Sequence, residues 1–132
     1  MASIRREILI HAAPDELWSA LRDVGALHTR LVPGFVIECV WDGEGRDITF
    51  ANGMKARELI VDVDDDSRRV AWTAVGHLKH HNASAQVFPE DAGTCRVVWI
   101  ADLLPDQMAP PIATVIEQGL AAMKRHAERP KG

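Results

Sequence analysis

The 132-residue sequence predicts an α+β fold in which a curved, seven-stranded antiparallel sheet wraps around one long C-terminal helix. Two observations lead to this prediction. Seven runs of residues are rich in β-formers, and the last six follow one another with only short turns between them. The segment from Gln107 to Arg129 has apolar residues at helical spacing instead. The helix can bury its apolar side only against the concave face of the sheet.

The length of the chain suits one domain over residues 1–132, because a domain of this size can bury an apolar core. The balance of 15 basic and 19 acidic residues argues against a nucleic-acid partner, which usually requires a basic surface. Cys39 and Cys95 lie far apart, which indicates neither a disulfide framework nor a zinc site. We expect no cofactor, no metal and no stable membrane insertion. The apolar run near the N-terminus is too short for a signal peptide or a membrane span, so a cytoplasmic protein is expected.

The first strand is expected from Ile4 to His11, and two short helices follow it. Pro14 suits the first position of a helix, and the acidic pair behind it suits the positive end of the helix dipole. That helix ends near Gly25, and residues 26–31 form one or two further turns before Pro33 and Gly34.

The remaining strands form a meander, since each gap between them contains turn residues such as Asn52-Gly53. Their expected ranges are Phe35–Trp41, Arg46–Ala51, Met54–Val63, Arg69–Gly76, His80–Pro89 and Thr94–Leu103.

The closing helix carries a glycine in the middle of its apolar stripe. Gly119 lies between Ile116 and Leu120 on that side, although a glycine inside a helix costs about 1 kcal/mol relative to alanine. Either a bulky side chain or a ligand is expected over this position. Because the glycine faces the sheet, we favour a cavity in which the missing side chain leaves room.

Several short segments carry a family resemblance: Ile8–Ile10, Ala13–Trp18, Pro33-Gly34, Gly45–Ile48, Glu58 with Asp64-Asp65, and Val98–Asp102. Together with the order of elements, they resemble the START-like (SRPBCC) superfamily. Within it the chain is most similar to bacterial proteins of the polyketide cyclase/dehydrase and lipid-transport type, and the resemblance covers almost the whole chain. It implies a helix-grip fold with a cavity for a hydrophobic small molecule between sheet and helix.

A more distant resemblance is to the plant abscisic-acid receptors, in which two loops flank the mouth of the pocket. The matching loops here are residues 51–55 and the loop that contains His77. The Ser-Gly-Leu-Pro sequence of the receptors' first loop is absent, and Asn82 replaces the tyrosine that follows their second loop. The resemblance therefore implies a pocket mouth between these loops and does not imply hormone reception.

The alternation of side chains along each strand predicts which residues line this pocket, since residues two apart share a face. If Glu58 faces inward as in the family, Ala56 and Ile60 share its face. The proposed ligand-binding residues are Ile37, Ile48, Phe50, Glu58, Ile60, Trp72, His77, Asn82, Ser84, Gln86, Trp99, Ile112, Ile116 and Gly119. Together they give an apolar lining with a few polar groups, which is typical of small-molecule sites.

Glu58 is the best candidate for chemistry, because a carboxyl group on an apolar face suits general acid or base catalysis. The competing interpretation is an ion pair with Arg46 or Arg57. Three histidines between His77 and His81 do not predict a metal site, because His80 and His81 point to opposite faces and no carboxylate or cysteine lies near them.

Two hypotheses about function follow. The first, which we favour, is a carrier or binding protein for a hydrophobic or amphipathic small molecule, because no nucleophile and base are paired in the sequence. The alternative is a polyketide cyclase- or dehydratase-like enzyme in which Glu58 acts as acid or base. A homodimer is also compatible with this kind of fold.

Overall fold

The computed structural model describes residues 1–130, and within them the order of elements is the predicted one. The elements are β1 (Ala2–Ile10), α1 (Pro14–Arg22), η1 (Leu27–Leu31, a single π-helical turn), β2 (Val36–Trp41), β3 (Gly45–Phe50), β4 (Lys55–Asp64), β5 (Arg69–Val75), β6 (His80–Asp91), β7 (Thr94–Leu104), η2 (Asp106–Met108, a 3₁₀ turn) and α2 (Ala109–Ala127). The two short helices between the first two strands are confirmed.

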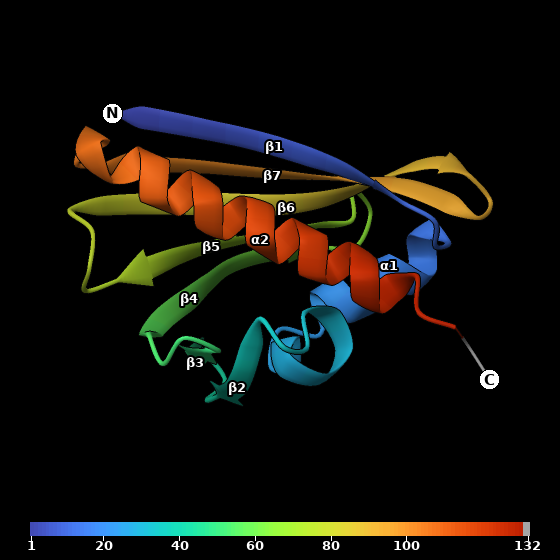
Figure 1. Ribbon diagram of the computed structural model, residues 1–132, viewed down its shortest axis with the longest axis horizontal. Helices are drawn as coiled ribbons and strands as arrows, with labels where there is room; N and C mark the ends of the chain where they lie inside the picture. The colour runs from blue at the N-terminus through green and yellow to red at the C-terminus, as the bar shows by residue number, and fades with distance from the viewer. Residues whose placement is uncertain (131–132) are drawn as a thin grey trace.

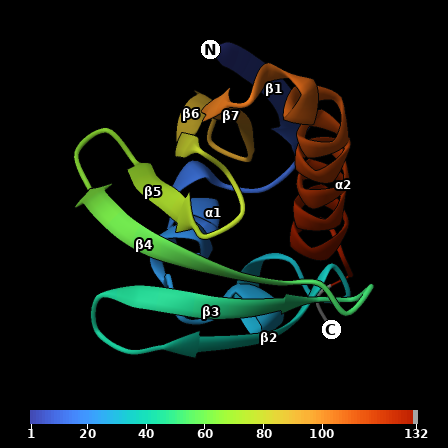
Figure 2. The same cartoon turned by 90° about the vertical axis from the view of Figure 1, so that its left-hand side faces the viewer.

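The strands form one antiparallel sheet in the order β1-β7-β6-β5-β4-β3-β2. Figure 2 shows the sheet curving from β1 and β7 at one side to β3 and β2 at the other, with α2 on its concave side. This is the helix-grip arrangement. It follows from the sequence, because six consecutive strands joined by short turns twist in one direction and leave a single concave face for the amphipathic helix.

Helix α2 is attached to β1 and to the end of that strand by polar contacts. Arg6 Nε lies 3.1 Å from a carboxylate oxygen of Glu117, and Lys124 Nζ donates to the carbonyl of Leu9 at 2.8 Å. The carboxylate of Glu128 accepts the backbone N–H of His11 at 2.8 Å. The apolar side of the helix, with Ile116, Leu120 and Met123, is buried against the sheet.

The two ends of the molecule are packed differently. We call the end with α1, η1 and the last turns of α2 the closed end, and its core side chains, such as Leu17, Leu31 and Met123, are buried. The open end is formed by the β3–β4 turn, the β5–β6 loop and the start of α2, which all lie at the left-hand end of the molecule in Figure 1. Apolar side chains here are only half-buried: Phe50, Leu78, Met108 and Ile112.

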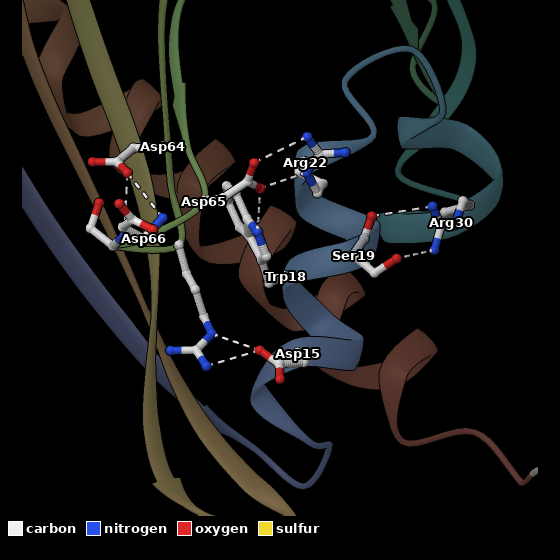
Figure 3. Close-up of polar contacts among 10 residues, drawn as sticks. Asp15, Trp18, Ser19, Arg22, Arg30, Asp64, Asp65 and Asp66 are labelled. Atoms are coloured by element: carbon white, nitrogen blue, oxygen red, sulfur yellow. Dashed lines mark hydrogen bonds and ion pairs between the residues drawn. The ribbon is translucent and has the colours of Figure 1, made fainter.

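Helix α1 is tied to the β4–β5 turn by a group of ion pairs (Figure 3). The carboxylate of Asp65 accepts hydrogen bonds from the Trp18 indole at 2.9 Å and from Arg22 Nε at 2.8 Å. Asp15 accepts two bonds from Arg68, at 2.9 and 3.0 Å. The β4–β5 turn therefore fastens the helix that closes one end of the sheet.

Candidate functional site

Four aromatic rings occupy the concave face beneath α2. Trp72 and Trp99 meet edge to face with their centroids 5.6 Å apart, and Phe35 and Phe50 meet the same way at 5.4 Å. A methyl group added at Gly119 would lie 2.9 Å from Trp99 Cζ3 and 3.3 Å from the ring of Phe35. A bulky side chain therefore covers the glycine, which is one of the two arrangements expected from the sequence; the other was a bound ligand. The favoured idea that Gly119 leaves room in a cavity is wrong, because Trp99 and Phe35 already fill that space.

Glu58 faces inward from β4 and forms a buried ion pair with Arg46 of β3, whose side chain is only 5% exposed. Arg46 Nε and one of its terminal nitrogens lie 2.9 and 2.8 Å from the same oxygen, Oε1. The other terminal nitrogen donates to the Val24 carbonyl at 3.1 Å, and the guanidinium lies 5.6 Å from the ring centroid of Trp72. Among residues 1–130, Oε2 of Glu58 has no hydrogen-bond partner.

His81 is the second polar group on this face, and it was not among the residues predicted to line it. It pairs with Leu103 across the ladder and lies two residues before the buried Ala83, which fixes it on the concave side. Its Nδ1 accepts the backbone N–H of Ala74 at 2.9 Å. Burial lowers the pKa of His81 below its usual value, while the carboxylate of Glu58 acts in the opposite direction.

Regular pairing between β5 and β6 ends just before Ala74 and His81. The ladder covers Arg69 to Trp72 of β5, and beyond it Thr73 and Ala74 bond to the carbonyl and the ring of His81 instead. A hollow of about 530 Å³ lies beside the ends of these strands and the loop between them. His81, Leu78 and Ala74 lie on its wall, together with outward-facing residues such as Val61 and Asn82.

A smaller hollow of about 120 Å³ lies at the closed end, between α1, η1 and the last turns of α2. Neither hollow is lined by Glu58, Trp72, Trp99 or Gly119, so neither coincides with the cavity that the sequence predicted under the helix.

Most of the other nominated residues face the concave side. Ile48 and Ile116 are buried in the core, while Ile60, Phe50 and Ile112 are half-buried against it. His77 lies in the β5–β6 loop, is exposed, and places its Nε2 3.1 Å from the carbonyl of Lys55 at the start of β4. The two loops that the receptor resemblance singled out are thus in direct contact.

The orientation predicted for four residues is wrong. Ile37 is the extra residue of a bulge between Val36 and Glu38, so it points outward with 56% of its surface exposed, and Val36 is buried in its place. On β6 the face is shifted by one residue. Ala83 pairs with the inward-facing Trp72, which puts Asn82, Ser84 and Gln86 on the convex side.

The correct face of β6 could have been found from the sequence. Ala83, Ala85 and Val87 form an unbroken apolar alternation, and all three are buried. Following that pattern places His81 inward. The position of Phe35 over Gly119 had no such signal, because Phe35 precedes a strand and reaches the helix only through the tertiary fold.

The remaining reactive groups are enclosed or dispersed. Both cysteines are buried free thiols, and burial raises the pKa of Cys95 to about 11. In the described part of the chain, no three His, Cys, Asp or Glu side chains come together as a possible metal site. None of the helices in residues 1–130 has the length and apolarity needed to cross a lipid bilayer.

Comparison with known families shows to which family the chain belongs. Residues 1–128 match the sequence profile described as polyketide cyclase/dehydrase and lipid transport. The chain belongs to this family. Membership of the polyketide cyclase/dehydrase and lipid transport family agrees with the helix-grip arrangement and with the resemblance seen in the sequence. A search among curated proteins finds no match.

Solved structures with the same fold include a START superfamily protein, a norcoclaurine synthase and an ARO/CYC protein. A START superfamily protein from Mycobacterium smegmatis aligns with a TM-score of 0.75 at 12% identity, covering 96% of this chain and 97% of the other. Truncated norcoclaurine synthase from Thalictrum flavum aligns with a TM-score of 0.74 at 20% identity, over 98% and 95%. BexL, a di-domain ARO/CYC protein from the BE-7585A biosynthetic pathway, aligns with a TM-score of 0.83 at 21% identity, over 97% of this chain and 47% of BexL. These likenesses establish a shared fold.

Proposed function

We propose that the protein binds a hydrophobic or amphipathic small molecule at the open end of the concave face and carries it without transforming it. The observation that supports this most directly is the uneven packing of the core. Apolar side chains are buried at the closed end, whereas Phe50, Leu78, Met108 and Ile112 stay half-buried around the open end. An apolar surface of this kind, next to a few fixed polar groups, is what small-molecule sites offer.

The hollow between β5 and β6 adds to this proposal. Its volume of about 530 Å³ falls within the range of ligand sites, and its lining includes Leu78 and His81 as well as outward-facing residues. The contact between His77 and the Lys55 carbonyl holds the two loops together beside it. A ligand seated at the open end would cover the half-buried apolar side chains and remove them from water, which is the main driving force expected for such binding.

The proposal can be tested with a panel of fatty acids, sterols and flavonoids. At least one class should raise the melting temperature and change tryptophan fluorescence in a saturable way, because Trp99 is half-buried on the concave face. The variant Ile112→Glu should weaken binding by tenfold or more, since it places a charge on the apolar start of α2.

Thr114→Glu is the matched control, because it adds the same charge on the exposed side of the same helix and should leave binding intact. Absence of binding by every member of the panel, or equal binding by the Ile112→Glu variant, would contradict the proposal.

A second candidate is a cyclase- or dehydratase-like activity with Glu58 as acid or base. It is favoured by the free Oε2 of Glu58, which is held on the concave face because Arg46 binds only Oε1. If the protein converts a bound aromatic or polyketide-like compound, Glu58→Gln should keep most of the affinity and abolish turnover, as followed by mass spectrometry of the products. Undiminished turnover in this variant would eliminate Glu58 as the acid or base.

A further inference from the structure

Two polar groups on the concave face have one hydrogen-bonding position each that the protein does not use. Glu58 of β4, Ala74 of β5 and His81 of β6 lie in one row across three neighbouring strands. Strands are about 4.8 Å apart, so the backbones that carry Glu58 and His81 are roughly 10 Å apart.

The hydrogen bond from Ala74 fixes which nitrogen of His81 carries the proton. Because Nδ1 accepts the backbone N–H of Ala74 at 2.9 Å, Nδ1 must be unprotonated and the proton of the neutral ring lies on Nε2. The lowered pKa of His81, caused mainly by burial, is consistent with a neutral ring. Among residues 1–130, Nε2 has no hydrogen-bond partner, and the residue lines the hollow between β5 and β6. His81 therefore presents a fixed N–H donor.

Glu58 presents a hydrogen-bond acceptor on the same face. Arg46 holds its Oε1 through two nitrogens, and this contact fixes the carboxylate while Oε2 remains a free acceptor. A polar group held in place by other protein groups gives a ligand more selectivity than a mobile one, because no ordering cost is added on binding.

We propose that His81 and Glu58 together select the ligand: an apolar molecule that carries a carbonyl or ether oxygen for the N–H of His81 and a hydroxyl for Oε2 of Glu58. This inference rests on the proposed function and specifies the chemistry of its ligand. A ligand with a carboxylate in place of the hydroxyl would face the negative charge of Glu58 and be disfavoured. The apolar body of the ligand would lie over Ala74 toward Leu78.

The test uses compounds of one shape that differ in these groups: hydroxyfluorenone, which has both, and hydroxyfluorene, which has a methylene group in place of the carbonyl. The wild-type protein should bind hydroxyfluorenone about tenfold more tightly, since one hydrogen bond is worth about that much. In His81→Phe the two compounds should bind with equal affinity, because the ring is retained and the donor is lost.

Two further variants separate ligand recognition from a structural role. His81→Gln keeps one acceptor for the Ala74 N–H and one donor, and it should restore the preference for the carbonyl compound. His11→Phe changes an exposed histidine that does not line the hollow between β5 and β6, and it should behave like the wild type. Equal weakening of both compounds by His81→Phe would mean that His81 only supports the strand, and this would overturn its assignment to the ligand.

Failure of this inference and failure of the proposed function give different results. If the wild-type protein binds both compounds with equal affinity, an apolar site exists but the assignment of His81 is overturned. If the wild-type protein and all variants bind neither these compounds nor any member of the lipid, sterol and flavonoid panel, the proposed function is overturned together with it.

Discussion

Gly119 shows how one residue determines the contact between the helix and the sheet. The glycine brings the backbone of α2 close to the ring of Trp99, and a Cβ at this position would lie 2.9 Å from Trp99 Cζ3. Trp99 in turn packs edge-on against Trp72. The conformational cost of glycine in a helix is about 1 kcal/mol, and the burial of an indole ring against the bare backbone offsets it.

Gly119→Leu should lower the free energy of unfolding by about 1–3 kcal/mol, because the new side chain must displace Trp99 and Phe35. Chemical denaturation followed by circular dichroism measures this difference. Ala121→Leu, on the exposed side of the same helix, is the control and should change the stability by no more than about 0.5 kcal/mol. A Gly119→Leu variant as stable as the wild type would show that space is available above the glycine.

His81 and Ile37 show why strand faces are harder to predict than strands. Both residues lie in segments that were predicted as strands, but a shift of one residue reverses every side chain. On β6 the polar residues drew the prediction to the wrong face, although the apolar alternation of Ala83, Ala85 and Val87 indicates the right one. On β2 the bulge at Ile37 depends on pairing with β3, which the local sequence does not reveal.

At the scale of elements, α1 is held by the β4–β5 turn through Asp65 and Asp15 (Figure 3). Hydrogen bonds from Arg22 and from the Trp18 indole lower the pKa of Asp65 below its usual value. Because the pKa is lower in the folded state, the ionised carboxylate stabilises the fold above its unfolded-state pKa of about 3.9. This contribution is lost as the pH falls through the folded-state value.

Asp65→Asn should therefore lower the melting temperature at neutral pH, and the difference from the wild type should shrink as the pH falls below about 4. Asparagine keeps one oxygen for the Trp18 indole but loses the charge that binds Arg22. Thermal unfolding between neutral and acidic pH measures the effect, with Asp66→Asn as the control on the same turn. A constant difference over the whole range would contradict the role assigned to the Asp65 charge.

At the scale of the whole molecule, the fold was predictable because many segments of the sequence indicate the same arrangement. Six strands with clear turns and one long amphipathic helix leave a single way to bury the apolar residues, and the structure has the predicted order. The inward positions of Trp72, Trp99 and Glu58 were also predicted correctly. The free volume under the helix was not predicted correctly. It depends on how Trp99, Phe35 and Gly119 fit together, and these residues come from distant segments of the chain.

The short ladder between β5 and β6 has a mechanical consequence. Only four residue pairs join these strands, whereas seven join β4 to β5 and eleven join β6 to β7. The ladders between β2 and β3 and between β3 and β4 are also short, with five pairs each, whereas nine pairs join β1 to β7. The most continuous part of the sheet is therefore formed by β1, β7 and β6, and α2 is anchored to its β1 edge. A load that spreads the concave face would act first on the short ladders from β2 to β6, while the helix stayed fixed to β1.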